Sequence, residues 1–381
     1  MASGQQSRPG SPQVVITGMG VTSAFGRGEA PLLAGIMSGE SAFGQAARFD
    51  TARCRVGVAA ELPGDPVLAV ELGTVIDQAC QGAGLDQQAR AAAVLLFALH
   101  TDQAAARNPA AGSVIGDVAG QVAAGCGLPG PQRVYTTACV AASTAVADAA
   151  AMICSGRASH VIVAAGYLVD ADSFRLFDAG RTLAGDGQVR PFSAGRQGLL
   201  LGDGAAAVVL EATEAARLRG APVLARLAGW GRAGDAYHVC QPRPDGTGLA
   251  RAIGAALSRA QVDRSDIGYL NANGPGTSFA DASEAAAIHQ AFGEYAGTIP
   301  ISSTKSVHGH ALEASALLEL VVTVLALRAG LLPVNAGFLA PDHACELDLV
   351  LNTAREAKAT YALSLNAAFG GANTALLVEA A

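Results

Sequence analysis

Short runs of β-branched residues alternate along this chain with longer stretches rich in alanine and leucine. Such runs are typical of buried strands, and the stretches between them have the composition of helices. The alternation therefore predicts an α/β protein. The pattern occurs twice along the chain, and the two occurrences meet near residues 211–216. The predicted strands are 14–16, 160–164, 206–210, 222–225, 267–270, 299–302, 361–365 and 374–378, and the predicted helices include 249–260 and 314–327.

Composition narrows the range of functions. With 381 residues, 51% of them hydrophobic, the chain can bury a large core. Its 46 glycines and 5% aromatic residues favour close backbone packing over a surface that stacks bases. The net charge is −7 and there is no basic run, so the sequence predicts binding neither to nucleic acid nor to an anionic membrane.

The cysteines and the N-terminal segment indicate a reducing compartment. The seven cysteines show no CxxC spacing, which argues against a zinc site and against a disulfide framework. Residues 1–13 form a polar tail without an apolar signal segment, and no later stretch has the character of a membrane span. We therefore expect a cytoplasmic protein. We find no motif for a metal or a nucleotide, and we expect no bound cofactor.

Cys139 is the most informative residue of the chain. It lies in the run Thr-Thr-Ala-Cys-Val-Ala-Ala-Ser at 136–143, where a predicted strand turns into an alanine-rich helix. Unpaired N–H groups and partial positive charge at a helix start stabilise a thiolate, so this position favours a reactive nucleophile. The alternative is an inert core cysteine, which is common among alanines.

Four further segments, in the same order along the chain, make the sequence resemble the β-ketoacyl synthases of the thiolase-like superfamily. Residues 303–310 match a Lys-x-x-x-Gly-His motif, and residues 369–373 match the end of an Asn-x-x-Gly-Phe-Gly-Gly-x-Asn turn, although the glycine before the phenylalanine is missing. Arg-Pro-Phe at 190–192 with Gly-Asp-Gly-Ala-Ala at 202–206, and the opening strand at 15–20, match two other family segments. The resemblance covers nearly the whole chain.

This resemblance implies a thiolase-like fold, in which two similar βαβαβαββ halves form a layered α-β-α-β-α core. The N-terminal half would be 14–215 and the C-terminal half 216–381. In the family, the region at about 53–130 carries a capping subdomain that contacts the dimer partner and the substrate. It is shortened here, which implies an altered entrance or an altered partner surface.

The resemblance also implies roles for individual residues. Cys139 would be the nucleophile, and His310 would either assist its deprotonation or polarise the incoming thioester. His308 is the less favoured member of the histidine pair, and His238 is assigned to structure. Lys305 would hold an active-site network with Glu319 as its partner on a helix. The backbone N–H groups of Cys139 and Phe369 would form the oxyanion hole, and the substrate and its pantetheine arm would contact Thr277, Phe369 and Gly370.

One segment departs from the family at a catalytic position. Where an elongating synthase has Asn-Ala-His-Gly-Thr-Gly-Thr, residues 271–277 are Asn-Ala-Asn-Gly-Pro-Gly-Thr. Asn273 thus replaces the first active-site histidine, and Pro275 replaces a threonine that helps hold the pantetheine arm. An asparagine N–H can donate a hydrogen bond to an enolate, but it carries no charge and transfers no proton. Related condensing enzymes do use a Cys-His-Asn set, with the asparagine in the other position.

The main hypothesis is a ketosynthase-like acyltransferase of fatty acid or polyketide biosynthesis, with Cys139, His310, Asn273 and Lys305 as catalytic residues. It would take its substrate from the phosphopantetheine of an acyl carrier protein or from coenzyme A, with condensation on malonyl units weakened. The alternative is a non-catalytic partner subunit, similar to a chain length factor, that pairs with an active ketosynthase. A thiolase-like degradative enzyme is a third and weaker interpretation. The family resemblance implies a homodimer or a heterodimer with a ketosynthase.

Overall fold

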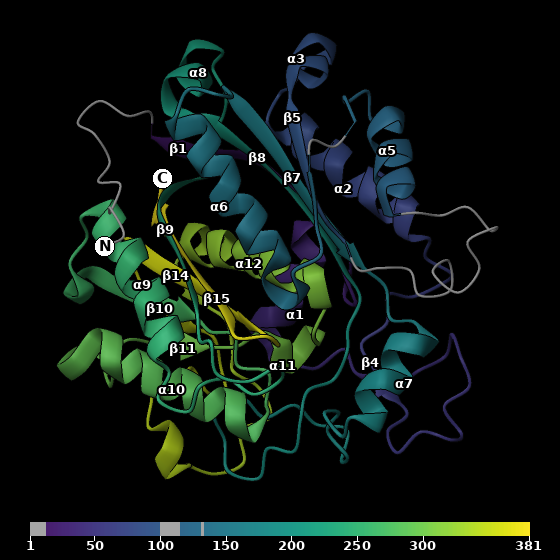
Figure 1. The fold of residues 1–381 in the computed structure, drawn as a ribbon, viewed down its shortest axis with the longest axis vertical. Coiled ribbons are helices and arrows are strands. Elements are labelled where there is room, and N and C mark those ends of the chain that lie inside the picture. Colours follow the sequence, from purple (N-terminus) through teal and green to yellow (C-terminus); the bar gives the residue numbers. More distant parts are fainter. Residues whose placement is uncertain (1–12, 100–114, 131–132) are drawn as a thin grey trace.

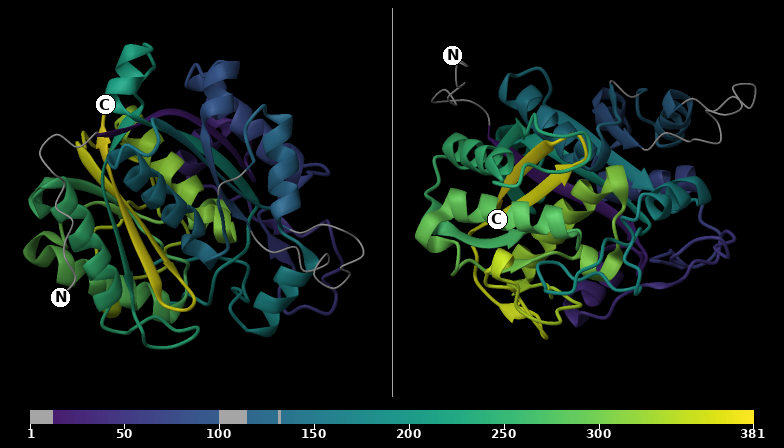
Figure 2. Two further views of the ribbon diagram at one scale, coloured as in Figure 1. Left: turned by 45° about the horizontal axis from the view of Figure 1, so that its top comes forward. Right: turned by 60° about the horizontal axis from the view of Figure 1, so that its bottom comes forward.

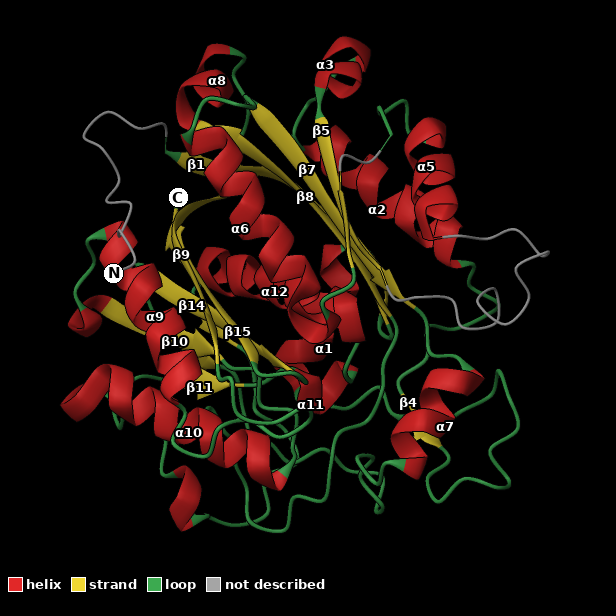
Figure 3. Cartoon of the chain, in the orientation of Figure 1, coloured by secondary structure: helices red, strands yellow, loops and turns green. Residues whose placement is uncertain are grey.

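In a computed structural model the described residues are 13–99, 115–130 and 133–381, and their centre is one large sheet (Figures 1 and 3). The first half supplies five neighbouring strands, and the second half supplies five more. From one edge to the other these are β11 (Ile301–Ser302), β10 (Ile267–Asn271), β14 (Tyr361–Ala368), β15 (Ala372–Ala380), β9 (Ala225–Gly234), β1 (Val14–Ser23), β8 (Gly204–Ala212), β7 (His160–Tyr167), β5 (Val94–Leu99) and β6 (Arg133–Tyr135).

The two halves of the sheet join at one short contact. Strand β1 pairs with β9 only where Val14–Ile16 lies opposite Ala225–Leu227, whereas it pairs with β8 along its whole length. The remaining strands are short: β2 (Gly26–Arg27) pairs with β1, β3 (Gly44–Gln45) with β4 (Val58–Ala59), and β12 (Leu331–Leu332) with β13 (Arg355–Glu356).

Helices form three layers around the two halves of the sheet (Figures 1 and 2). The central layer contains α6 (Ala141–Cys154) and α12 (Ser315–Ala329), which pack between the halves, and the largest hydrophobic core lies here. One outer layer contains α2 (Leu68–Gly82) and α5 (Ile115–Gly125), and the other contains α9 (Thr247–Ala260) and α10 (Ser278–Phe292). This α-β-α-β-α arrangement is the layered fold predicted from the sequence.

Smaller helices lie at the ends of the sheet and beside the strands. They are α1 (Glu29–Ser38), α3 (Gln87–Ala92), α7 (Ala171–Ala179), α8 (Thr213–Leu218) and α11 (Lys305–His308). Among the described residues, no helix is both long and apolar enough to cross a membrane.

Glycines bring an outer helix close to the sheet in both halves. A Cβ added to Gly20 of β1 would lie 2.0 Å from the carbonyl oxygen of Val75 on α2. A Cβ added to Gly231 of β9 would lie 1.9 Å from the carbonyl oxygen of Ala252 on α9. Only glycine fits at such contacts, because every other residue would place an atom inside the helix backbone. The glycine-rich composition is therefore used for close packing of strand on helix.

Two sequence predictions need adjustment. The strand predicted at 222–225 lies instead at Ala225–Gly234, where buried and less buried positions alternate over the first seven residues. This strand contains three glycines, three alanines and no β-branched residue, so a search for β-branched runs does not detect it. In addition, α2 and β5, which lie within the predicted capping region, belong to the core of the first half. The rest of that region includes residues 100–114, which lie outside the described residues.

Candidate active site

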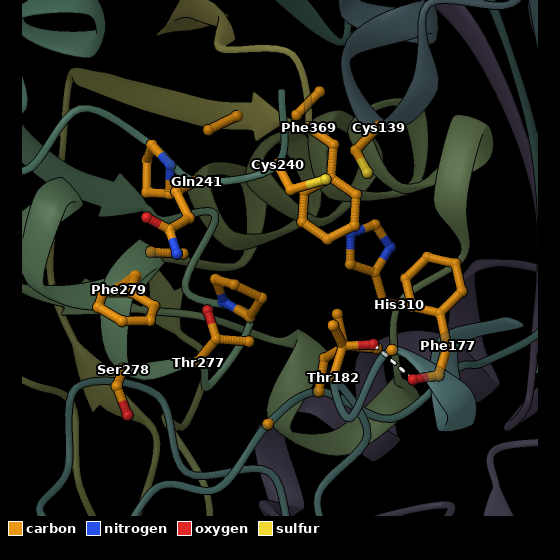
Figure 4. Close-up of a pocket in the computed structure, with 18 of the residues that line it drawn as sticks. Cys139, Phe177, Thr182, Cys240, Gln241, Thr277, Ser278, Phe279, His310 and Phe369 are labelled. Carbon is orange, nitrogen blue, oxygen red and sulfur yellow. Dashed lines mark hydrogen bonds between the residues drawn. The ribbon is translucent and has the colours of Figure 1, made fainter. Parts of the chain in front are cut away.

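Cys139 lies on a strained turn at the start of the central helix α6. Strand β6 ends at Tyr135, a short 3₁₀ turn covers Ala138–Val140, and α6 begins at Ala141. Ala138 has a φ of 52°, a left-handed conformation that is rare for residues other than glycine. This turn directs the Cys139 side chain into a cavity of about 390 Å³ (Figure 4). The strand, turn and helix confirm the placement predicted from the sequence.

The protonation of Cys139 differs from the expectation of a stabilised thiolate. Burial raises the pKa of the Cys139 thiol to about 12, and the nearby carboxylate of Glu313 acts in the same direction. Lys305 lowers this pKa, but the loss of hydration has the larger effect. Cys139 is therefore a neutral thiol at neutral pH. The helix start correctly indicated the position of Cys139, but the pKa shift has the opposite direction to the one expected, because the sequence does not show which groups surround the thiol.

His310 lines the same cavity, and its hydrogen bonds fix the position of its proton. Its Nδ1 atom accepts the Leu312 N–H at 3.0 Å and lies 3.0 Å from the Ser315 hydroxyl. A backbone N–H can only donate, so the Leu312 contact requires Nδ1 to be the acceptor. Since Nδ1 accepts, the neutral imidazole carries its hydrogen on Nε2.

The neutral state of His310 follows from its surroundings. Burial lowers the pKa of His310 well below its ordinary value, and the positive charge of Lys305 lowers it further. A neutral imidazole with its hydrogen on Nε2 is a hydrogen-bond donor. Of the two roles expected for His310, the geometry therefore supports polarising the thioester over removing the Cys139 proton.

His308, the less favoured member of the histidine pair, does not line the cavity. It is fully buried, and both ring nitrogens have partners: Nδ1 lies 2.8 Å from the Gly309 carbonyl oxygen and Nε2 lies 2.9 Å from the Thr304 hydroxyl. Burial lowers the pKa of His308 to about 3, so it is neutral. These bonds hold α11 in place between Lys305 and His310.

Lys305 forms the predicted ion pair with Glu319 and also contacts Asn273. Both members of the pair are buried, with Lys305 on α11 and Glu319 on α12. The Lys305 ammonium also donates to the Asn273 carbonyl oxygen at 2.8 Å and to its side-chain Oδ1 at 3.3 Å. Asn366 donates to the other oxygen of Glu319. Behind the cavity, Lys305 on α11 therefore links Glu319 on α12 to Asn273 in the loop after β10.

The remaining predicted residues lie at or beside the cavity mouth (Figure 4). Thr277 and Phe369 line it together with Cys139, His310 and Asn273. The Phe369 ring is about half exposed and stacks on Phe177, with ring centres 6.2 Å apart. The Phe369 N–H follows the end of β14 and has no acceptor among the described residues, as an oxyanion donor requires. Gly370 lies outside the lining of this cavity, and its N–H donates to the Val239 carbonyl at 2.9 Å.

Comparison with known proteins agrees with this geometry. Residues 74–216 match the model of the β-ketoacyl synthase N-terminal domain, and residues 224–339 match the model of the C-terminal domain. Nodulation protein E of Rhizobium meliloti is 42% identical over 260 residues, which are 67% of this chain and 63% of that protein. 3-Oxoacyl-[acyl-carrier-protein] synthase 2 of Staphylococcus aureus is 35% identical over 265 residues, which are 68% of this chain and 66% of that protein.

The chain belongs to the β-ketoacyl synthase family.

Solved structures place it in the thiolase-like fold of the ketosynthases. The ishigamide ketosynthase/chain length factor has a TM-score of 0.88 and 29% identity, over 97% of this chain and all of that chain. A type II polyketide ketosynthase, solved in complex with its acyl-carrier protein, has a TM-score of 0.89 and 25% identity over the same shares.

In the cavity that contains Cys139, the side-chain amide of Asn273 has a defined orientation. Lys305 can only donate, so the amide oxygen faces Lys305 and the NH₂ group points away from it. The NH₂ group has no acceptor among the described residues, and Asn273 lines the cavity. Asn273 can therefore donate to an oxyanion, but it cannot exchange a proton with the substrate.

The loop that carries Asn273 and Pro275 is held by two carboxylates that the sequence reasoning missed. Glu284 accepts the N–H groups of Asn273 and Gly274, each at 2.7 Å, and Asp281 accepts that of Gly276 at 3.1 Å. Burial raises the pKa of Asp281 and of Glu284 to about 7. The spacing of Asp281 and Glu284 could have identified them in the sequence. They are three residues apart on the helix that follows a glycine-rich loop, so they lie on the same face of that helix.

Proposed function

We propose that this chain is a ketosynthase-like acyltransferase of fatty acid or polyketide biosynthesis, with Cys139 as the acyl acceptor. The observation that carries the proposal is one cavity lined by Cys139, His310, Asn273 and Phe369, in a chain of the β-ketoacyl synthase family. The substrate is an acyl thioester on the phosphopantetheine of a carrier protein or on coenzyme A.

The proposed transfer is balanced in atoms and protons. The Cys139 sulfur attacks the thioester carbonyl, and the oxyanion that forms is stabilised by the Cys139 and Phe369 N–H groups. The bond between the carbonyl carbon and the carrier sulfur then breaks, and the acyl group stays on Cys139. The departing carrier thiolate requires one proton, and the Cys139 thiol releases one. A strong base is therefore not needed overall, which fits a thiol that is neutral at neutral pH.

Condensation with a malonyl unit makes a further demand on the site. Decarboxylation produces an enolate, whose oxygen needs donors at the moment its charge develops. His310 Nε2–H and the Asn273 NH₂ group supply two neutral donors. In the elongating pattern a histidine occupies position 273. We propose that decarboxylation here is slow compared with acyl transfer.

Acylation of Cys139 tests the enzyme proposal directly. After incubation with acyl carrier thioesters of several chain lengths, intact mass spectrometry should show one acyl group on the wild-type chain and none on Cys139→Ala. Cys240, which also lines the cavity, provides the control: Cys240→Ala should still be acylated. No adduct on the wild-type chain with any of the thioesters would refute the proposal.

A second variant tests the role of Asn273. Asn273→His, alone and with Pro275→Thr, should raise carbon dioxide release from malonyl carrier protein by at least about tenfold, because the site gains a more polar donor. Acylation of Cys139 should stay close to the wild-type rate. If the wild-type chain already condenses malonyl units at a rate that the variants do not improve, Asn273 is a competent donor and the chain is an elongating synthase.

A non-catalytic partner subunit is the second candidate. It is favoured by Asn273 and by the high pKa of Cys139, and one of the similar structures is described as a ketosynthase/chain length factor. Retention of Cys139, Lys305 and His310 in one site speaks against it. Light scattering should show a dimer, either of this chain alone or with a ketosynthase that has the complete Cys-His-His set. Stable co-purification with such a ketosynthase, together with absent acylation, would favour the partner role.

A further inference from the structure

Ser315 is a buried serine at the start of the central helix α12, in contact with the imidazole of His310. It is 1% exposed, and it lies outside the lining of the Cys139 cavity. Its hydroxyl contacts two residues of the preceding turn: the oxygen accepts the Ala311 N–H at 2.8 Å and lies 3.0 Å from His310 Nδ1. The acyl transfer proposed above makes no use of this residue.

The hydrogen of the Ser315 hydroxyl belongs to the contact with His310. Nδ1 accepts the Leu312 N–H, so it carries no hydrogen of its own and can only accept from Ser315 as well. The Ala311 N–H, in contrast, donates to the serine oxygen. Nδ1 therefore receives two donors, one from the backbone and one from a side chain, which share its lone pair.

The two donors attach His310 to different parts of the molecule. The Leu312 N–H belongs to the turn that follows His310 directly, and Leu312 itself has a left-handed φ of 42°. Ser315 is the first residue of α12, whose residues 315–326 are all buried. A side chain supported by a buried helix is positioned more precisely than one supported by a loop alone. Ser315 thus ties the imidazole to the central layer of the fold.

The two donors are compatible with only one state of the ring. Nε2 already carries a hydrogen, so a further proton could enter only at Nδ1, where it would displace both donors. A hydrogen bond to the neutral form of a group favours that form. Ser315 therefore acts in the same direction as burial and the charge of Lys305, which lower the pKa of His310.

We propose that Ser315 is a positioning residue that holds His310 with its Nε2–H directed into the cavity, toward the thioester carbonyl of the substrate. A neutral donor contributes most when it is already in place as negative charge develops on that oxygen. The His310 ring and the Cys139 sulfur point into the same cavity (Figure 4), so a change in the ring orientation moves the donor away from the reacting group. The proposal rests on the proposed function, which supplies the identity of the substrate.

The kinetics of Cys139 acylation by an acyl N-acetylcysteamine thioester test the positioning role. Ser315→Ala should lower the maximal rate about fivefold, the factor that corresponds to one hydrogen bond. The half-saturating concentration should stay the same, because Ser315 does not line the cavity. Ser315→Thr keeps the hydroxyl and should retain most of the wild-type rate. The matched control is Ser193→Ala, which removes another buried hydroxyl that bonds backbone groups and should leave the kinetics unchanged.

A double-mutant cycle shows whether Ser315 acts through His310. In a His310→Ala background, Ser315→Ala should lower the acylation rate no further, because the ring that it positions is absent. An equal loss in both backgrounds would overturn the proposal, since it would reveal a general effect on the fold. An unchanged maximal rate in Ser315→Ala alone would overturn it as well.

Nuclear magnetic resonance of protein with isotope-labelled histidine nitrogens gives a readout that needs no substrate. The His310 signals are identified by their loss in His310→Ala. In Ser315→Ala the Nδ1 resonance should move toward the frequency of a ring nitrogen that accepts no hydrogen bond, and in Ser193→Ala it should stay in place. If the resonance moves but Cys139 of the wild type is never acylated, only the proposed function fails. If the wild type is acylated and the resonance does not move, only the role of Ser315 fails.

Discussion

The two halves of the molecule use one backbone arrangement and give it different chemistry. In each half a 3₁₀ turn precedes the central helix: Ala138–Val140 before α6 and Leu312–Ala314 before α12. Each turn opens on a left-handed residue, with φ of 52° at Ala138 and 42° at Leu312. The second residue of the first turn is Cys139, and the second residue of the other is Glu313. Equivalent positions thus carry a thiol in one half and a carboxylate in the other.

The charges that act on Cys139 come from the second half. Glu313 and Glu319 raise the pKa of the thiol and Lys305 lowers it, and all three residues follow the join. The second half also supplies the donors His310 and Asn273. The two halves therefore share a backbone pattern but contribute different groups: the first half supplies the Cys139 thiol, and the second half supplies the charges that set its pKa and the polar groups that line the same cavity. Similar turns carry different chemistry here, because the side chains at equivalent positions differ.

The largest expected effect comes from removing the cation of the second half. Lys305→Met should lower the free energy of unfolding by about 3–5 kcal/mol, because it leaves the buried Glu319 carboxylate without its ion pair. Urea unfolding measures the change. Lys305→Met/Glu319→Gln should recover much of it, since the uncompensated charge is then gone. An unchanged unfolding curve for the single variant would show that Lys305 and Glu319 are not coupled as described.

The difference between the two turns is tested more directly at Glu313. Glu313→Gln removes a negative charge that raises the pKa of Cys139, so this pKa should fall. The rate at which iodoacetamide alkylates Cys139 well below that pKa should rise about tenfold for each unit of the fall, because the thiolate is the reactive form. Mass spectrometry after timed alkylation at several pH values gives the rate. Exposed Glu356→Gln is the control and should alkylate as the wild type does.

The buried carboxylates of the second half predict a dependence of stability on pH. The pKa values of Asp281 and Glu284 are about 7 in the folded chain, against about 4 in an unfolded one. Between these values the folded state holds protons on these two carboxyls that the unfolded chain releases, so their contribution to the free energy of unfolding should fall as pH rises from about 4 to 7. The buried neutral His308 and His310 contribute in the opposite direction, because the unfolded chain protonates them below about pH 6.5. Glu284→Gln should make this fall smaller, whereas exposed Glu214→Gln should not. Thermal unfolding across the pH range measures it, and parallel profiles for wild type and Glu284→Gln would contradict the account.

The smallest expected effect separates the strain of the two turns from their packing. Ala138→Gly should stabilise the chain by about 0.5 kcal/mol, since glycine adopts the left-handed conformation without steric cost. Leu312→Gly relieves the same strain but removes a buried side chain, so it should destabilise the chain by about 2 kcal/mol. Urea unfolding distinguishes the signs. A loss of stability in Ala138→Gly would mean that the left-handed turn is not strained.

The sequence by itself determined the class of fold and the family, and it named most of the residues that gather at one cavity. Its repeated strand and helix pattern gave two halves, and separate motifs named Cys139, Lys305, His310 and Phe369, which the structure brings to one cavity or directly behind it. The partner Glu319 was also named correctly. These predictions succeed because they depend on local patterns, such as a turn before a helix or the order of residues in a motif.

Tertiary structure decided the protonation and orientation of those residues. The pKa of Cys139 depends on burial and on Glu313, which lies 174 positions further along the chain, so a helix-start argument gave the wrong direction. The proton of His310 is fixed by the Leu312 N–H, and the orientation of the Asn273 amide by Lys305. Dehydration and charge act through space, and distances between segments exist only after the chain has folded.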